Sequence, residues 1–423
     1  MVRESKIDGI TLGLLLLILF LGWLNLYSVS AVDDPSIINF TTHHGKQAVF
    51  ILFSLGLGAL ILFLDTKFVE ITSYFVFGGA MVLLAAVLFV SKVSGASSWF
   101  QIGGIKIQPT EFAKVAVLMA LAKYMSRFNF SFDRTQDFLS VGAAVVIPMI
   151  LVLAQNDAGS AIVFSGIIFM LYREGLHPFF LVLLFLVVIN GAISIIFSTT
   201  PLVNGYIVLF HVLAVAAAAV FLALRNQIQS IFVVLGVGVL MVCITLGVNY
   251  LVKPYQSARI RVLVASQEEI QEEESLKKVN YNLEESLVAI GSGGLAGKGY
   301  QQGTHTRGAF VPEEHTDFIF CVIGEEHGFI GTATVLLLFL LLLARIVYVA
   351  ENSKSRYARV YGYGVASIIF MHVLVNVGMT IGLLPTIGIP LPFFSKGGSS
   401  MISFTLMIFV LMNLYSYRTN ILT

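Results

Sequence analysis

Long apolar runs, separated by short polar segments, make up most of this chain. A helix needs about 20 apolar residues to cross a bilayer, and twelve runs come near that length. They cover residues 10–27, 49–64, 71–90, 110–125, 138–154, 158–172, 178–197, 206–224, 231–251, 318–349, 365–384 and 401–415. Because backbone groups in hydrocarbon must bond within the protein, we expect each run to be helical. The pattern predicts an all-α fold, a polytopic membrane helical bundle.

The polar connections differ in charge, and this difference predicts how the bundle is oriented. Lysine and arginine concentrate in alternate connections, at Arg3, Lys6, Lys67, Lys123, Arg127, Arg134, Arg173, Arg225, Lys354, Arg356, Arg359 and Arg418. Cytoplasmic loops are enriched in these residues, so we assign that side to the cytoplasm. The opposite side receives the Trp99 loop, the turn at 156–157, and the segments 253–316 and 385–398. Segment 253–316 is therefore expected to be a large extracytoplasmic loop.

Composition narrows the class of protein further. The chain is 57% hydrophobic and only 12% charged, and its net charge of +1 gives no reason to expect a nucleic-acid partner. Its two cysteines lie in apolar runs, and its eight histidines show no zinc-site spacing. Arg3 and Lys6 precede an apolar run without a small-residue cleavage site, which indicates a retained first span rather than a removed signal peptide.

Asp317 is the first candidate for chemistry. It follows the polar segment 312–316 and directly precedes an apolar run, so it lies at the membrane interface and at a helix start. A partly desolvated carboxylate there can act as a general base or bind a metal ion. An ordinary helix cap is the competing interpretation.

Charged and aromatic residues near other helix starts allow two interpretations each. Glu111 and Lys114 are three residues apart within a span, so they can pair either beside a cavity or as a structural ion pair. Asp157 follows a sharp turn, where a helix cap competes with catalysis. Trp99 lies in an outer loop, where most tryptophans are interfacial anchors.

Three further segments could bind an anionic group. The glycine-rich segment 291–299 contains Lys298, although it lacks the Walker pattern and a flexible turn is the alternative. Arg259 follows the ninth span and could bind a lipid pyrophosphate or generic headgroups. The segment 383–400 contains three prolines and Lys396, which predicts a broken, re-entrant backbone beside a cavity.

Seven segments of the chain, most of them discussed above, together resemble the SEDS family of peptidoglycan glycosyltransferases, whose members include RodA and FtsW. The matching segments are WFQIGGIKIQPTEFAK at 99–114, DAGSA at 157–161, PYQSARI at 254–260, AIGSGGLAGKG at 289–299, PEEHTDFIF at 312–320, GEEHGFIG at 324–331 and LPTIGIPLPFFSKGGSS at 384–400. Their order runs through most of the chain, so the resemblance is specific.

The resemblance implies an enzyme that polymerises lipid II, the undecaprenyl-pyrophosphate-linked precursor, at the outer face of the bacterial inner membrane. It implies that Asp317 is the essential residue and that Trp99, Glu111 and Lys114 line or support a central cavity. Positive charge for the leaving pyrophosphate would come from Arg259, Lys298, Lys396 or a divalent cation such as Mg or Mn. The implied partner is a class B penicillin-binding protein with transpeptidase activity.

The resemblance also predicts how the chain is organised. The family has about ten membrane helices, so we expect a single membrane domain over 1–423 with an inserted helical hairpin at 178–224. Four residues depart from the family pattern. Ser98 replaces an arginine, Asn156 a proline, Glu285 a glutamine and Lys396 a tyrosine. We interpret Lys396 as a substitute phosphate contact for the missing arginine.

Several functions stay open at this point. The short terminal tails favour a RodA-type role in cell elongation over an FtsW-type role in septation. A flippase for the lipid-linked precursor would also use intramembrane Glu111 and Lys114, but no inverted repeat is visible. A non-catalytic scaffold would leave Asp317 dispensable.

Overall fold

The computed structural model describes residues 8–31, 36, 39–90, 98–102, 105–197, 201–224, 228–308, 310–311 and 313–416. The chain divides into two compact units, which we describe separately. The first unit comprises Met1–Leu176, Glu285–Ile381 and Ile387–Thr423. The second comprises His177–Glu284 and Gly382–Thr386.

The first unit contains the helices that surround Asp317. Its helices are α1 (Gly9–Ser30), α2 (His43–Phe63), α3 (Thr66–Ala86), α4 (Pro109–Met125), α5 (Thr135–Ala154), α6 (Ala158–Ser165), α7 (Ile167–Arg173), α14 (Ile319–Glu351), α15 (Arg356–Thr380) and α16 (Gly398–Ser416), with a 3₁₀ turn η1 at Val87–Phe89. A short antiparallel hairpin, β1 (Phe100–Ile102) and β2 (Ile105–Ile107), precedes α4.

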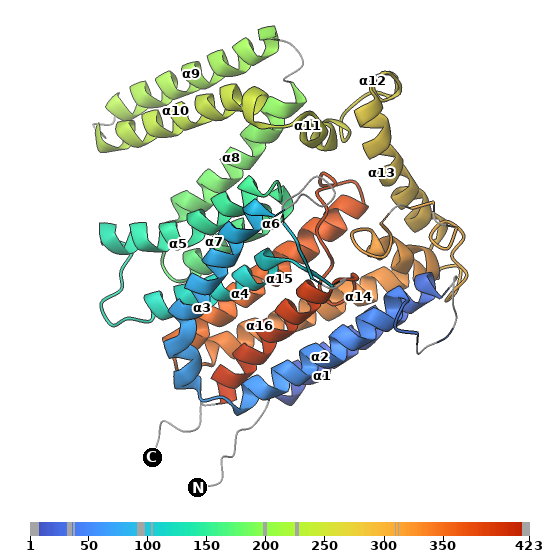
Figure 1. Cartoon of the computed structure of the whole chain (residues 1–423). Coiled ribbons are helices and arrows are strands. Elements are labelled where there is room, and N and C mark those ends of the chain that lie inside the picture. Colours follow the sequence, from blue (N-terminus) through green and yellow to red (C-terminus); the bar gives the residue numbers. More distant parts are fainter. Residues whose placement is uncertain are drawn as a thin grey trace. The chain divides into compact units, whose positions relative to one another are not determined.

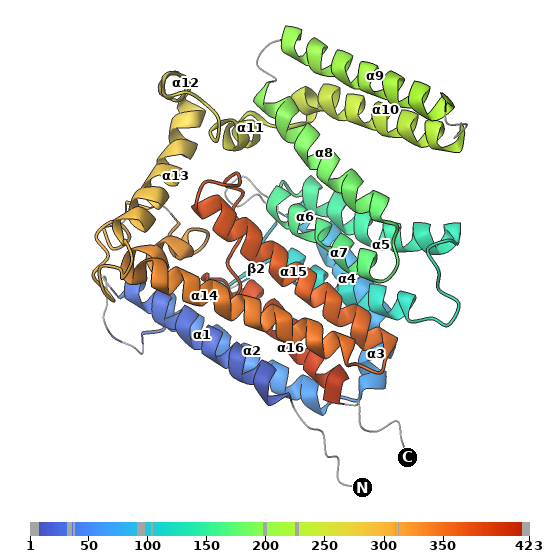
Figure 2. The ribbon, with the colours of Figure 1, turned by 180° about the vertical axis from the view of Figure 1, so that it is seen from behind.

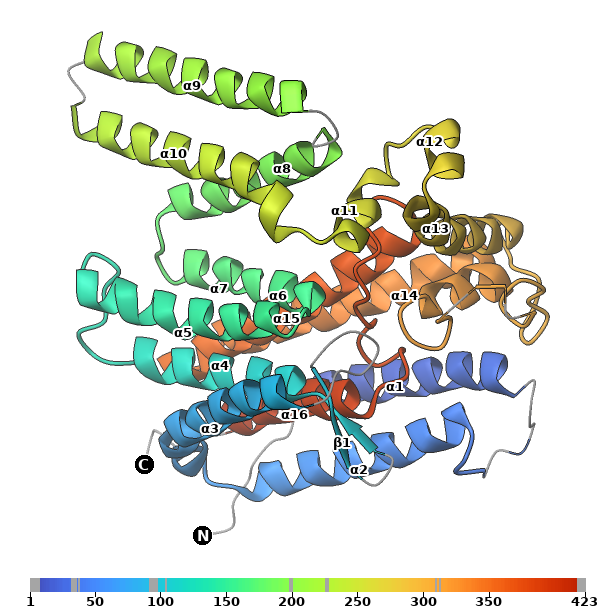
Figure 3. The same ribbon diagram turned by 45° about the horizontal axis from the view of Figure 1, so that its top comes forward.

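The second unit is also helical. It contains α8 (Pro178–Ile196), α9 (Pro201–Leu224), α10 (Ile228–Leu251), α11 (Pro254–Arg261), α12 (Gln267–Glu272) and most of α13 (Glu274–Ser292). Helices α9 and α10 lie side by side, and α10 also packs against α8 (Figure 3). The predicted hairpin at 178–224 therefore corresponds to α8 and α9. Both pack on α10.

Each predicted apolar run coincides with a helix, and the all-α prediction is confirmed. The run at 158–172 is divided into α6 and α7 at Gly166. Within the described residues, eight helices are long and apolar enough to cross a membrane: α1, α2, α3 with η1, α5, α8, α14, α15 and α16. Helix α4 has 17 residues and is slightly shorter. The chain is therefore a multi-pass membrane protein.

Burial separates central helices from peripheral ones in the first unit. In the most apolar stretch of α15, 89% of residues are buried, compared with 17% in α2. Helix α15 packs against both α14 and α4, while α2 packs on α16 and α3 on α4 (Figure 1). The exposed apolar residues of α2, α3 and α5 are therefore available to lipid, and α4, α15 and α16 form the core.

Many basic residues of this unit lie at one end, where α4 and α14 end and α15 begins. There they form ion pairs, among them Lys123–Glu70 at 2.7 Å, Arg173–Glu351 at 2.6 Å, Arg359–Glu174 at 2.9 Å and Arg345–Asp8 at 2.5 Å. Asp317 and Asp157 lie at the opposite end, where α14 and α6 begin. This separation matches the charge asymmetry of the sequence.

Helix α14 breaks at Gly328, whose φ of 62° and ψ of −158° are not helical. The glycine-rich segment 293–299 supplies the missing backbone partners. Phe329 N donates to Gly294 O, and Lys298 N donates to Glu325 O, at 2.9 and 3.0 Å. Where a helix breaks within the membrane, the freed backbone N–H and C=O groups must form hydrogen bonds elsewhere in the protein. The glycine-rich segment therefore has a structural role at the break.

Replacing Gly328 by alanine should destabilise the protein. A Cβ at this position would meet the backbone of Gly297 and Leu295, and such a backbone conformation costs other residues about 1–3 kcal/mol. The melting temperature of the purified protein in detergent should fall by several degrees. Gly78→Ala is the matched control, because nothing lies within 4 Å of a Cβ there. Equal melting temperatures for the two variants would contradict this account.

Candidate active site

Asp317 lies in the turn that precedes α14, and its side chain is half-buried. The N-cap of α14 is the next residue, Phe318, which makes no side-chain cap hydrogen bond. Asp317 is therefore not at the position of a helix cap. Its Oδ2 lies 3.1 Å from where a Cβ on Gly388 would stand, and Gly388 has a φ of +80°. Only a glycine allows the loop to pass this close to the carboxylate.

Asn376 on α15 fixes the backbone on both sides of this contact. Its Nδ2 donates to the carbonyl oxygen of Asp317 at 2.8 Å and to that of Ile389 at 2.7 Å. The loop 387–398 is bound to the same turn at two further points. Ser395 Oγ donates to Thr316 O at 2.6 Å, and Lys396 N donates to His315 O at 2.8 Å. The loop and the turn therefore form one hydrogen-bonded unit.

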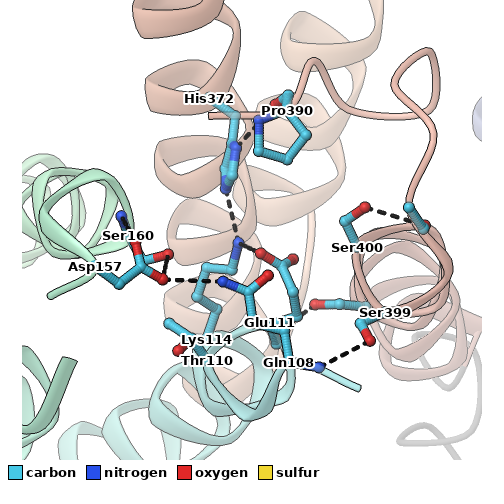
Figure 4. Close-up of polar contacts among 12 residues, drawn as sticks. Gln108, Thr110, Glu111, Lys114, Asp157, Ser160, His372, Pro390, Ser399 and Ser400 are labelled. Carbon is cyan, nitrogen blue, oxygen red and sulfur yellow. Dashed lines mark hydrogen bonds and ion pairs between the residues drawn. The ribbon is translucent and has the colours of Figure 1, made fainter. Parts of the chain in front are cut away.

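Glu111 and Lys114 form a buried ion pair at 2.8 Å, with side-chain exposures of 2% and 0%. The ammonium of Lys114 also lies 2.7 Å from His372 Nε2, and His372 Nδ1 lies 3.2 Å from Pro390 O (Figure 4). A carbonyl can only accept, so Nδ1 carries the proton and Nε2 accepts from Lys114. The pair is thereby connected to the loop that faces Asp317.

Asp157 is the N-cap of α6, as one of the two interpretations predicted. Its carboxylate accepts from Ser160 N at 3.0 Å and from Ser160 Oγ at 2.8 Å. It also accepts from Gln108 Nε2 at 2.9 Å, which ties α6 to the start of α4 (Figure 4). The preceding Asn156 has a φ of 63°, a conformation that proline cannot adopt. The turn before Asp157 therefore has a backbone conformation that a proline at position 156 would exclude.

Trp99 directly precedes β1 and is half-buried. The neighbouring Ser98, where the sequence resemblance leads us to expect an arginine, is only 2% exposed and donates to Gln155 O at 3.3 Å. A guanidinium would not fit this buried position in the same way. The structure therefore places Ser98 in the protein interior, and the cavity role of Trp99 stays a prediction.

Lys396 lies among other basic residues near Asp317. Its Nζ is 2.8 Å from His43 Nδ1, and the rings of His43 and His315 are 4.6 Å apart. Burial, then repulsion from Lys46 and to a smaller extent from Lys106, lowers the pKa of Lys396, while attraction from Glu313, which is larger than the effect of Lys106, partly opposes the shift. We call Lys396, Lys46 and Lys106 the basic cluster. An anion placed there would relieve the mutual repulsion of these ammonium groups.

Lys298 has a different environment. Its Nζ donates to Glu325 Oε1 at 2.5 Å and to Thr304 Oγ1 at 2.7 Å. Glu325 is fully buried and also accepts from the backbone N–H groups of residues 304, 305 and 306. This ammonium is thus engaged in holding the glycine-rich segment to α14, and its predicted contact with phosphate stays untested.

Arg259 belongs to the second unit and is described within it. It lies on α11, with its guanidinium 5.7 Å from the ring centre of Tyr255. Helices α11 and α13 share a small apolar core of Ala258, Val262, Leu276 and Leu283. The predicted contact of Arg259 with pyrophosphate stays a prediction.

Sequence reasoning missed two residues of this site, His372 and Asn376. Both are almost fully buried, at 2% and 0% exposure, and they are four residues apart on the most buried span. Polar residues within a membrane helix are expensive and usually functional, so their position inside an apolar run was a usable signal. Their partners, the carbonyls of Asp317, Ile389 and Pro390, could not be inferred without the fold.

Few side chains could serve as ligands for the predicted divalent cation. Within the described ranges, no three His, Cys, Asp or Glu side chains lie close enough together to hold a metal ion. Asp317 remains the single candidate ligand, and we derive no step through a metal.

The chain matches the FtsW/RodA/SpoVE family model, described as a cell cycle protein, over residues 9–208 and 204–420. The peptidoglycan glycosyltransferase RodA of Treponema pallidum is 30% identical over 424 residues, which cover 94% of this chain and 94% of that protein. The peptidoglycan glycosyltransferase MrdB of Escherichia coli K12 is 30% identical over 347 residues, covering 80% and 76%.

Two solved structures have a similar fold. A chain from a study of the structural coordination of polymerization and crosslinking by a peptidoglycan synthase complex has a TM-score of 0.70 and 24% identity, covering 98% of this chain and 99% of that chain. Thermus thermophilus rod shape determining protein RodA has a TM-score of 0.61 and 24% identity, covering 98% of each chain. Both comparisons support the helical membrane fold.

Glu314, three residues before Asp317, should make stability depend on pH. Burial, with repulsion from Glu325, raises the pKa of Glu314 from 4.5 to about 8. The folded protein therefore binds a proton that the unfolded chain releases near pH 4.5, and stability should fall as pH rises from about 4.5 to about 8. Glu314→Gln should weaken this fall in melting temperature. Glu313→Gln, at an exposed neighbour, should leave it unchanged. Identical pH profiles for wild type and Glu314→Gln would refute the assignment.

Proposed function

This chain belongs to the FtsW/RodA/SpoVE family, and from that premise we propose that it polymerises lipid II into glycan strands at the outer face of the inner membrane. The match to the family model and the similarity to RodA and MrdB identify the chain as a peptidoglycan glycosyltransferase of the RodA type, as the sequence resemblance predicted. A relative from Geobacter metallireducens that is named a probable peptidoglycan glycosyltransferase FtsW is 28% identical over 344 residues, so a septal role is the alternative.

The position of Asp317 is the observation that supports this mechanism best. Its carboxylate is half-buried at the start of α14, and its backbone is held by Asn376. Glycan extension forms a bond between the 4-hydroxyl oxygen of an acceptor sugar and the anomeric carbon of a donor. The bond from that carbon to the pyrophosphate oxygen breaks, and the hydroxyl proton must leave. We assign Asp317 as the general base that accepts it.

The departing pyrophosphate needs positive charge, and the basic cluster is well suited to supply it. Lys396 is bound through its backbone to His315, two residues before Asp317. Lys114 is already paired with Glu111, and Lys298 with Glu325. Lys396 therefore has the best claim among these three to act as an electrostatic partner of the leaving group. Arg259 remains a further candidate on the second unit.

Orientation in the membrane follows from charge. Lys123, Arg173 and Arg359 lie at the end of the first unit opposite Asp317. By the enrichment of cations in cytoplasmic loops, that end would be cytoplasmic and Asp317 extracytoplasmic. A class B penicillin-binding protein is the proposed partner. The fold shared with a chain of a peptidoglycan synthase complex supports this pairing.

Asp317→Asn should abolish polymer formation. The change keeps the shape of the side chain and removes the base, and loss of a general base typically costs about 10²- to 10⁴-fold in rate. Purified protein, alone and with its partner, would be incubated with lipid II, and the product resolved by length on a gel. Asp65→Asn, at the N-cap of α3, is the control and should keep full activity.

The same assay distinguishes the alternatives. Translocated but unpolymerised lipid II would favour a flippase, and full activity of Asp317→Asn would exclude the general-base role. Polymer formed in the presence of a chelator would show that the reaction does not require a divalent cation.

Asn376→Ala should lower kcat with little change in KM, because Asn376 positions the backbone of Asp317 without reaching substrate. Asn413→Ala is a closely matched control. Asn413 is equally buried, and its Nδ2 likewise donates to two carbonyls, those of Ile61 and Leu64, at 2.9 Å each. We expect both variants to lose similar stability and only Asn376→Ala to lose turnover under conditions where both are folded. Equal turnover in the two variants would reject the positioning role.

A further inference from the structure

A cavity of about 600 Å³ lies at the loop that connects α4 to α5, at the basic end of the first unit. Figure 2 shows this loop at the edge of the unit, past the ends of the two helices. Backbone bonds keep the loop folded, because Phe130 N donates to Arg127 O and Arg134 N donates to Ser131 O, at 3.2 Å each. Ligand pockets commonly have volumes of about 300–1,000 Å³. The cavity therefore has room for a phosphate and the groups esterified to it.

Two arginines line this cavity, Arg127 and Arg134. Arg127 donates from Nε to Tyr124 O at 3.0 Å and from Nη2 to Asp137 Oδ1 at 3.1 Å. Arg134 donates from Nη1 to Asn129 O at 2.7 Å. A guanidinium has five N–H donors. In the part of the chain that the structure describes, more than half of the donors of each arginine therefore remain available to a ligand.

The charged groups around the cavity favour an anion. Asp137 is the carboxylate among the described lining residues, and besides Arg127 it accepts from the Tyr124 hydroxyl at 3.0 Å and from Ser131 N at 3.2 Å. Its charge is thus stabilised within the protein. Asp133, also in the loop, does not line the cavity. Two guanidiniums against one bonded carboxylate leave a positive site, and the planar guanidinium matches the geometry of a phosphate.

Phe128 indicates that the anion belongs to a lipid. It lines the same cavity, and its side chain is 100% exposed. The helices on either side of the loop face lipid near this end, where α3 exposes Phe68 and α5 exposes Leu139. The ion pair of Lys123 with Glu70 holds the end of α4 beside α3. Phe128 can therefore reach acyl chains while the arginines bind a headgroup, whereas a soluble phosphate would leave the ring in water.

We propose that the α4–α5 loop binds one anionic glycerolipid, with its phosphate at Arg127 and Arg134 and with Phe128 among its acyl chains. On the proposed orientation this lipid belongs to the cytoplasmic leaflet, whose anionic lipids attract basic segments. The site lies at the end of the first unit opposite Asp317 and shares no residue with the candidate active site. A bound lipid stabilises the folded chain by mass action.

The test is lipid binding by the purified full-length chain in detergent. The probe is palmitoyl-oleoyl phosphatidylglycerol, titrated while native mass spectrometry counts bound lipids and the melting temperature is followed. Wild type should bind one lipid ahead of all others and become more stable. Arg127→Gln and Arg134→Gln should each weaken this binding about tenfold, the lower end for a charged hydrogen bond, because the site is open to solvent. Phe128→Ser should weaken it about three- to tenfold through lost apolar contact.

Arg173→Gln is the matched control for Arg127→Gln. Both arginines are 51% exposed, and each pairs with a carboxylate and lies over a tyrosine ring, but Arg173 does not line the cavity. Arg173→Gln should bind the lipid as wild type does. Phe89→Ser, which removes a ring that is 90% exposed at the far end of α3, should do so too. Without lipid, Arg127→Gln should melt close to wild type, since Asp137 keeps two other donors.

Several results would overturn the proposal. Equal weakening by Arg173→Gln and Arg127→Gln would mean general attraction to the basic end, and unchanged binding in Phe128→Ser would remove the acyl contact. Equal affinity for palmitoyl-oleoyl phosphatidylcholine would show that the site does not select an anionic headgroup. Displacement of the lipid by an equal concentration of inorganic phosphate would assign the arginines to a soluble anion and reject the lipid.

Discussion

Backbone groups that leave helical geometry among packed membrane helices must find partners within the protein, and this constraint shapes the end of the first unit that carries Asp317. The chain breaks there twice, at Gly328 and in the loop 387–398. At the first break the partners are other backbone groups of the glycine-rich segment. At the second they are side chains, chiefly Asn376 and Ser395. Asp317 lies where the second set converges, so the bonds that allow the loop also fix the carboxylate.

The buried ion pair of Glu111 and Lys114 adds a second layer of support. Removing two charges from water is costly, and such a pair is tolerated when further hydrogen bonds satisfy it. Lys114 obtains one from His372, which in turn bonds to the loop at Pro390. Loss of either charge would leave the other buried and unpaired. The pair can therefore affect the loop facing Asp317 without contacting a substrate. This favours a structural role for the pair over direct contact with the substrate.

The sequence was enough to predict the elements but not the contacts between them. Apolar runs identified each helix, because the period and length of such runs are set by the bilayer. The basic end was predictable for a different reason, because lysine and arginine are enriched in cytoplasmic loops. The role of the glycine-rich segment could not be predicted. Glycines that surround a phosphate and glycines that pack against a break in a helix have the same pattern in a sequence. His372 and Asn376 were missed because their importance depends on carbonyls from distant segments. Which residues of α14, α15 and α16 contact one another depends on how these helices pack, and a single sequence does not reveal that packing.

Three buried asparagines differ in how fully the protein satisfies their amide groups. Asn376 and Asn413 each use both amide hydrogens on backbone carbonyls where a helix ends or a loop passes. Within the described residues, the donors of both side chains are satisfied, while the Oδ1 of each has no partner. Asn25 uses neither its donor nor its acceptor, although it is buried to a similar degree. The same residue type at the same burial therefore has different meanings. Among the described residues, Asn25 therefore carries the larger cost of an unpaired buried amide, roughly 1–3 kcal/mol.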